Sequence, residues 1–426
     1  MSTRTSIEVA VEGGRRATAA QAAPLIWKFG GTSVADHDRL RAVAERMVAA
    51  QQSGRGVVAV LSAMGKSTDH LVDEAYAMSS RPPVRELDAL LSVGEAISCA
   101  LASMAVAELG SHAVSLTGPQ AGISTDDRHG NARLVGINPQ RIRDALAGGS
   151  IVLVTGFQGL GPDGDVTTLG RGGSDASAVA VAAALGVGEC EIFTDVPAVF
   201  TADPRVVPDA RRLSSIRHEE MLEMAEAGAA VLQPRSVELG LAHGVDIHLR
   251  SSFSTEQGTW IRREGAGFED GAEVAGIAHR RQESLYAVDG AGAGPVVAAL
   301  AERAVTVGAI VPTDAGVRFS APGADAHEVT AALEAVGLVA KVDEELGSVS
   351  VVSLGIARKP DIAVRALAAL EADGIMPRLV TSTPGRISVS VPSGQIDDAV
   401  RLLHRIFIPA AERTSVSDLN APADAA

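Results

Sequence analysis

The chain has 426 residues, which corresponds to two or three domains of about 150 residues each. Its hydrophobic fraction of 46% and charged fraction of 21% are typical of a globular protein and exclude a disordered chain. The formal net charge of −15 argues against general binding to nucleic acids or anionic membranes. No run approaches the roughly 18 apolar residues of a membrane span. Cys99 and Cys190 are too few for a disulfide framework.

Both ends of the chain have a composition that does not predict a packed structure. Residues 1–23 lack the apolar core of a secretory signal, so we expect a flexible N-terminal extension and a cytoplasmic protein. The polar, alanine-rich tail at 411–426 is also expected to be flexible.

Residues 24–275 predict alternating strands and helices. The expected strands are 25–29, 56–63, 112–118, 150–157, 190–196 and 245–252, and the expected helices are 37–52, 84–108 and 174–186. A near-continuous apolar run such as 56–63 is typical of a parallel strand that is buried on both faces. This alternation predicts an α/β domain in which helices cover a largely parallel central sheet.

The pattern changes near residue 275. Residues 284–337 predict the order β-α-β-β-α, and residues 348–407 predict the same order again, as a repeat of roughly 70 residues that matches by element order. This order is typical of the ferredoxin-like βαββαβ fold. We therefore expect two small domains at 276–345 and 346–410.

A glycine-rich segment, Lys28–Val34, directly follows the first expected strand. Glycines let the backbone approach an anion, and Lys28 offers a mobile charge for phosphate oxygens. The order of a Walker A loop is absent. A simple turn with a solvated lysine remains the alternative.

A second glycine-rich segment, Thr168–Asp175, opens the expected helix 174–186. Backbone N–H groups at a helix N-terminus bind anions, and the guanidinium of Arg171 can accept a carboxylate in bidentate fashion. A tight turn capped by an aspartate is the alternative, but three glycines around one arginine favour ligand binding.

Two further segments place polar groups after expected strands. Thr194-Asp195, followed by Asp203-Pro204-Arg205, is suited to Mg²⁺ or its waters and to phosphate, with a capped turn as the alternative. Ser62–Thr68 and Glu95 are suited to the carboxylate and ammonium of an amino acid, with a polar loop and a solvated glutamate as the alternative.

Together these segments resemble aspartate kinase. The strings KFGGTSVAD, SAMGKSTD, SVGEAIS, TLGRGGSDASAVAVAAALG and CEIFTDVPAVFTADPR stand in that family's order across residues 25–260, and the C-terminal repeats resemble its paired ACT regulatory domains. The resemblance implies an amino-acid-kinase-type αβα sandwich followed by two ACT domains. It also implies transfer of the ATP γ-phosphoryl group to the β-carboxylate of L-aspartate, giving 4-phospho-L-aspartate, the first step towards lysine, threonine and methionine.

The resemblance also assigns roles to individual residues. It implies that the catalytic residues are Lys28, Arg171 and Asp175. For L-aspartate it implies Ser62, Thr68, Glu95, Phe157, Arg171 and Ser174. For ATP and its Mg²⁺ it implies Lys28, Gly30, Gly31, Ser33, Thr194, Asp195, Phe200, Arg205, Ser252 and Phe253, without a set of direct protein ligands to the metal. A carboxylate acceptor with a pKa near 3.9 needs no general base.

Some positions depart from the family pattern. Phe200 stands where a tyrosine is common, Ala198 replaces a glycine and Gln233 replaces a histidine, but no charged catalytic group is lost. The turn at 289–295 lacks the Asp-x-Pro-Gly of members that bind lysine or threonine. We therefore expect feedback inhibition by these amino acids to be weak, absent or retuned.

Two alternative functions and the assembly remain open from the sequence. A related amino-acid kinase of a specialised pathway and a non-catalytic regulatory subunit are the alternatives to aspartate kinase. We expect a homo-oligomer formed through the ACT domains, because exposed sheet edges favour pairing.

Overall fold

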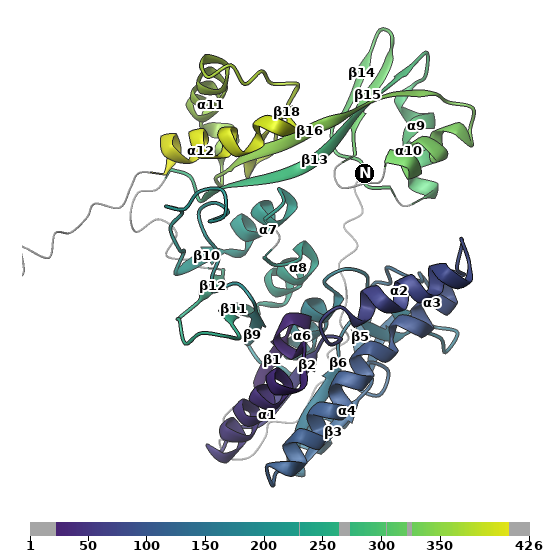
Figure 1. Cartoon of the computed structure of the whole chain (residues 1–426), viewed down its shortest axis with the longest axis vertical. Coiled ribbons are helices and arrows are strands. Elements are labelled where there is room, and N and C mark those ends of the chain that lie inside the picture. The colour runs from purple at the N-terminus through teal and green to yellow at the C-terminus, as the bar shows by residue number, and fades with distance from the viewer. Residues whose placement is uncertain (1–22, 230, 264–272, 304, 322–325, 409–426) are drawn as a thin grey trace, which may run out of the picture. The chain divides into compact units, whose positions relative to one another are not determined.

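The computed structural model describes residues 23–229, 231–263, 273–303, 305–321 and 326–408. The chain divides into two compact units (Figure 1): the first comprises the chain up to Val199 together with Arg212–Asp270, and the second comprises Phe200–Arg211 together with the chain from Gly271 onward. The expected N-terminal extension, apart from Ala23, and the expected tail lie outside the described residues.

The first unit is built on an eight-stranded sheet in the order β10-β12-β11-β9-β1-β2-β6-β3. These strands are β1 (Leu25–Phe29), β2 (Val57–Leu61), β3 (Ala113–Leu116), β6 (Ile151–Thr155), β9 (Glu189–Thr194), β10 (Ser215–Arg217), β11 (Asp246–Ser251) and β12 (Thr259–Arg262). β12 runs antiparallel to β11 and parallel to β10, and all other neighbours pair in parallel. Every residue of β2 and β6 is buried, as expected for central strands covered on both faces.

Helices cover both faces of this sheet. α1 (His37–Gln52) and α4 (Val93–Glu108) lie side by side on one face (Figure 1), where they bury alternate strand residues such as Phe29, Leu61 and Leu153. The opposite face carries α6 (Gly173–Leu185), and α8 (Pro234–His243) packs against α6. The remaining helices are the 3₁₀ helix η1 (Gly31–Val34), α2 (Ser67–Met78), α3 (Val84–Leu91), α5 (Gln140–Ala147) and α7 (His218–Glu226). The αβα sandwich expected from the sequence is confirmed.

A second, four-stranded sheet of the first unit has no counterpart in the sequence-based expectations. Its order is β5 (Leu134–Ile137), β4 (Ile123–Thr125), β7 (Gln158–Leu160) and β8 (Val166–Thr168). Strands of three or four residues are too short to leave a readable apolar pattern, which is why they were missed.

The expected helix 84–108 is two helices, α3 and α4, which meet at Ser92. By length and composition alone the stretch Val84–Glu108 is long and apolar enough to cross a membrane, contrary to the sequence-based expectation. Two carboxylates, Asp88 and Glu95, are nevertheless buried within it, and Cys99, Ala102 and Val106 pack into the core with α1. These contacts are typical of core helices in a folded domain.

The second unit contains a six-stranded antiparallel sheet in the order β14-β15-β13-β16-β18-β17. Its strands are β13 (Gly276–Asp289), β14 (Ile310–Thr313), β15 (Gly316–Ser320), β16 (Ala340–Val352), β17 (Leu379–Ser382) and β18 (Arg386–Pro392). Its helices are α9 (Ala293–Glu302), α10 (Ala326–Glu334), α11 (Pro360–Ala372) and α12 (Ile396–Phe407), with the 3₁₀ helices η2 (Ile356–Arg358) and η3 (Ser393–Gln395).

Two lobes share the long strands β13 and β16 (Figure 1). In one lobe α9 and α10 pack against Tyr286 and Val288 near the end of β13. In the other, α11 and α12 pack against Ile277 at the start of β13 and against Val349 in β16. The boundary expected between residues 345 and 346 therefore falls inside β16, and the first residues of β13 join the second lobe. Element order along the chain cannot reveal this exchange, because it depends on which strand halves pair.

Residues Phe200–Arg211 interrupt the first unit and belong to the second. The Thr201 carbonyl accepts a bond of 2.7 Å from the Ile277 N–H, and the Thr201 hydroxyl lies 2.9 Å from Nε2 of His404 on α12. Arg401 donates to the Val206 carbonyl at 3.0 Å. The domain expected at 24–275 is therefore not continuous, since this segment is part of the core formed by α11 and α12.

Candidate active site

The carboxyl ends of five neighbouring parallel strands define one edge of the large sheet. In the order β11-β9-β1-β2-β6, they end at Ser251, Thr194, Phe29, Leu61 and Thr155. The strands end in register, since Ser251 pairs with Thr194 and Leu61 pairs with both Phe29 and Thr155. The polar segments singled out in the sequence follow these strands directly, so the tertiary structure gathers them at the edge where ligands bind in open α/β folds.

The centre of this edge holds a buried ion pair. Lys28, the fourth residue of β1, directs its ammonium toward Asp175 on the first turn of α6, and Nζ lies 2.7 Å from Oδ1. Both residues are only 8% exposed. Because side chains alternate along a strand, Lys28 faces α6 while its neighbours Trp27 and Phe29 face α1 and α4. The ion pair fixes the position of the Lys28 ammonium at the sheet edge.

The loop after β1 turns sharply at two glycines. The Gly30 N–H donates to the Phe193 carbonyl at 3.1 Å, and the 3₁₀ helix η1 starts at Gly31. A side chain on Gly31 would place its Cβ 2.9 Å from the Ala63 carbonyl oxygen, so the site requires glycine. The hydroxyl of Ser33 is buried and accepts a bond of 2.6 Å from Ser252, which follows β11.

The nucleotide end expected from the sequence forms next to this loop. The Thr194 hydroxyl donates to Asp195 at 3.1 Å, and the Ser252 N–H donates to the Thr194 carbonyl at 2.9 Å. Phe253 is half-exposed, with the Arg39 guanidinium 4.8 Å from the centre of its ring. Arg39 was not singled out in the sequence, where it reads as one of several charged residues on α1.

Glu95 stands on the other side of the ion pair, on the first turn of α4. It is 3% exposed, and its Oε1 accepts a bond of 3.1 Å from the Ala63 N–H. Its Oε2 is buried without a hydrogen-bond partner in the described part of the chain. Burial raises the pKa of Glu95 to about 7, against an ordinary value of 4.5. A buried carboxylate oxygen with no partner is suited to a cationic ligand group.

Residues that follow β2 and β6, together with residues of α2 and α6, complete this side of the site. Ser62 follows β2 and donates its N–H to the Phe29 carbonyl at 3.1 Å, and Thr68 is half-buried on the first turn of α2. Ser174 packs against Gly156, where a Cβ would approach it to 2.6 Å. Phe157 has a φ of 71°, the only positive φ outside glycine in the described chain. Such strain is typical of functional sites.

Arg171 lies in the turn that opens α6. It precedes Gly172, which has a φ of 74° and caps the helix, and Asp175 lies on the first turn of the helix. A Cβ on Gly172 would overlap the side chain of Gln233 at 1.8 Å, so no larger residue fits. Arg171 is exposed. Arg171 therefore lies just before α6, and the first turn of that helix carries Asp175, the partner of Lys28 from β1.

Two residues expected at the nucleotide lie outside the first unit. Phe200 and Arg205 belong to the segment that packs in the second unit. Asp203 receives several hydrogen bonds from Arg205, including one of 2.7 Å from Nη2, and these bonds lower the pKa of the Asp203 carboxyl. The structure thus brings the other expected residues to one edge but holds these two through contacts of the second unit.

No group of three or more histidine, cysteine, aspartate or glutamate side chains within the described ranges is arranged to hold a metal ion. Mg²⁺ commonly binds through phosphates, waters and one or two carboxylates, and Asp195 at the sheet edge fits that mode.

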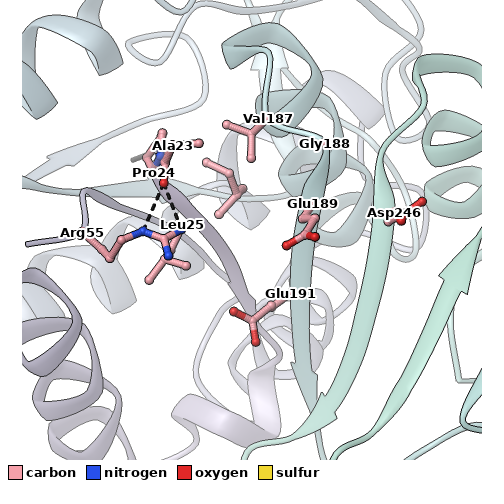
Figure 2. Close-up of a pocket in the computed structure, with 10 residues that line it drawn as sticks. Ala23, Pro24, Leu25, Arg55, Val187, Gly188, Glu189, Glu191 and Asp246 are labelled. Atoms are coloured by element: carbon pink, nitrogen blue, oxygen red, sulfur yellow. Dashed lines mark hydrogen bonds between the residues drawn. The ribbon is translucent and has the colours of Figure 1, made fainter. Parts of the chain in front are cut away.

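A pocket of about 340 Å³ (Figure 2) is lined by residues at the opposite, amino ends of β1, β9 and β11, including Leu25, Glu189 and Asp246.

Comparison with known proteins identifies the family of this chain. Residues 24–251 match the model of the amino acid kinase family. The chain is 44% identical to the aspartokinase of Mycolicibacterium smegmatis, over 90% of this chain and 96% of the relative, and 42% identical to aspartokinase 2 of Bacillus subtilis, over 90% and 97%. The chain therefore belongs to the amino acid kinase family, and within it to the aspartokinases.

Solved structures share the fold over 90% of this chain. The E. coli aspartokinase III structure with aspartate and ADP, in its R-state, superposes with a TM-score of 0.77 at 22% identity and covers 90% of this chain and 99% of that one. The aspartate kinase of Synechocystis has 33% identity and a TM-score of 0.52, covering 90% and 69%. The protein is thus an enzyme of the aspartokinase type, and its second unit has the ACT-type fold that the sequence predicted.

Proposed function

We propose that this enzyme transfers the γ-phosphoryl group of ATP to the β-carboxylate of L-aspartate. A carboxylate oxygen of aspartate forms a bond to the γ-phosphorus, the bond from that phosphorus to the β,γ-bridging oxygen breaks, and 4-phospho-L-aspartate and ADP are released. No proton has to be removed from the acceptor, because its carboxyl group is ionised at neutral pH. The chief physical obstacle is repulsion between an anionic acceptor and a polyanionic donor.

The observation that carries the proposal is the buried pair of Lys28 and Asp175 between two groups of polar residues. On one side lie Gly30, Gly31 and Ser33, where the two glycines, which lack side chains, let phosphates approach the backbone. In this position the Lys28 ammonium stabilises negative charge that develops on the γ-phosphoryl oxygens, and Asp175 keeps the ammonium in place. Thr194, Asp195, Ser252 and Phe253 extend the nucleotide side, whereas Phe200 and Arg205 belong to the segment that packs in the second unit.

The other side suits an amino acid with two anionic groups. Oε2 of Glu95 accepts the α-ammonium, and Arg171, with the N-terminus of α6, binds the α-carboxylate. Ser62, Thr68, Phe157 and Ser174 form the walls that orient the β-carboxylate toward the phosphorus. Mg²⁺, when bound with ATP, offsets charge on the β- and γ-phosphates, and Asp195 would hold it or its waters.

Regulation and assembly are part of the proposal. We expect the second unit to bind an amino-acid effector, lysine or threonine, only weakly, because the turn at 289–295 lacks the Asp-x-Pro-Gly pattern. Its sheet ends in two edge strands, β14 and β17, which are suited to pairing with a second copy in a homo-oligomer. The product enters the route towards lysine, threonine and methionine in the cytoplasm.

A coupled assay of ADP release tests the proposal against its alternatives. ADP release that depends on L-aspartate supports it. Release that depends on L-glutamate instead identifies a related amino-acid kinase. Release with neither, while the protein still binds ATP or an effector, identifies a non-catalytic regulatory subunit.

A further inference from the structure

A fully buried carboxylate close to the candidate site takes no part in the chemistry described so far. Asp88 on α3 is 1% exposed, yet its two oxygens are fully engaged. The Gly130 N–H donates to both oxygens at 3.0 Å, Nδ1 of His129 lies 2.8 Å from Oδ2, and the Thr168 hydroxyl donates to Oδ1. A buried charge is costly unless it is satisfied, so this network fixes each of its members in one geometry.

The hydrogen-bond partners of Asp88 lie in two segments, the end of β8 and the loop that begins at His129. Thr168 ends β8 and stands three residues before Arg171, in the glycine-rich turn. Its carbonyl accepts a bond of 2.8 Å from the Ala132 N–H, in the loop that His129 and Gly130 begin.

Arg235 closes the same arrangement from α8. Its guanidinium donates to the carbonyls of Leu169 and Ala132 at 2.9 and 2.8 Å. The backbone that leads into Arg171 is therefore tied to the loop beginning at His129 through Asp88 and through Arg235. The Arg171 side chain is exposed and has no comparable anchor among the residues that the structure describes.

We infer that Asp88 and Thr168 are positioning residues for Arg171. Through their hydrogen bond they set the path of the backbone at residues 168–172, and thereby the direction in which the Arg171 guanidinium meets the α-carboxylate of the acceptor. The inference rests on the proposed function, because it assigns Arg171 to the amino-acid substrate. Neither residue touches a reacting group, so their effect falls on acceptor binding and not on the nucleotide.

Adjacent threonines of β8 provide a matched test. Thr167 and Thr168 are each 1% exposed, and each forms one buried hydroxyl bond, but Thr167 bonds to Thr125 and not to Asp88. The Thr168→Val variant should raise KM for aspartate about tenfold or more, with KM for ATP changed less than about twofold. Thr167→Val should leave both constants near wild type, and Thr168→Ser, which keeps the hydroxyl, should restore the wild-type KM.

A double-mutant cycle with Arg171→Ala shows whether the effect passes through the guanidinium. In that background Thr168→Val should raise KM for aspartate no further. Equal effects of Thr167→Val and Thr168→Val, or a Thr168→Val effect that persists without the Arg171 side chain, would overturn the inference. If the wild-type enzyme shows no ADP release that depends on aspartate, the proposed function fails instead, so the two failures are distinguishable.

Discussion

Replacement of Glu95 by glutamine should stabilise the protein while it damages the site. Burial raises the pKa of Glu95 to about 7 from an ordinary value of 4.5. The folded state therefore holds this proton more tightly than the unfolded chain does. Protonation of Glu95 therefore stabilises the folded state fully below pH 4.5, and this stabilisation is lost as the pH rises through 7. The ionised carboxylate at pH 8 costs roughly 3 kcal/mol, since each pKa unit corresponds to about 1.4 kcal/mol.

Glutamine cannot ionise, so the Glu95→Gln variant escapes this cost. At about 2–4 °C per kcal/mol for a unit of this size, its melting temperature at pH 8 should exceed that of the wild type by roughly 6–12 °C. The difference should shrink toward zero near pH 4.5. The matched control is Glu108→Gln, which changes an exposed glutamate at the other end of α4 and should alter the melting temperature little at either pH.

The same substitution should weaken aspartate binding. The variant loses a charged partner for the α-ammonium, and hydrogen bonds to charged groups contribute about 1.5–3 kcal/mol. We therefore expect KM for aspartate to rise about 10- to 100-fold, with KM for ATP nearly unchanged. In the wild type, KM for aspartate should fall as the pH rises from 6 to 8, because binding requires the ionised form. A melting-temperature gain that is equal at pH 5 and pH 8 would refute the reasoning from burial.

Three other predictions concern the catalytic cation, the helix turn and regulation. Lys28→Ala should lower kcat at least about a hundredfold and change KM for aspartate far less; full turnover in steady-state assays would contradict this role. Gly172→Ala should cost more than the roughly 1–2 kcal/mol of a left-handed alanine, because its Cβ meets Gln233, whereas Gly186→Ala, with the same φ of 74° and open space around it, should cost only that strain in thermal unfolding. Lysine and threonine added together should inhibit the kinase activity only weakly in a titration. Strong joint inhibition at effector concentrations below about 1 mM would disprove this.

The sequence alone determined the class of fold and the residues worth testing. Buried parallel strands need runs of apolar residues, and helices need apolar residues that recur at helical spacing. The strand 25–29, the helix 37–52 and the twofold repeat after residue 275 were therefore readable. The turns at Gly31 and Gly172 were readable because only glycine fits such close approaches, but the sequence left open whether they bind a ligand.

Only the tertiary structure decided how these parts meet. The sheet order β11-β9-β1-β2-β6 joins segments more than a hundred residues apart and brings Lys28 to Asp175. Burial of Glu95 shifts its pKa, and no local pattern encodes how deeply a helix residue will lie. The sharing of β13 and β16 between two lobes, and the packing of residues 200–211 into the second unit, follow from long-range strand pairing and core contacts. Such pairings depend on the whole chain, and local propensity carries no record of them.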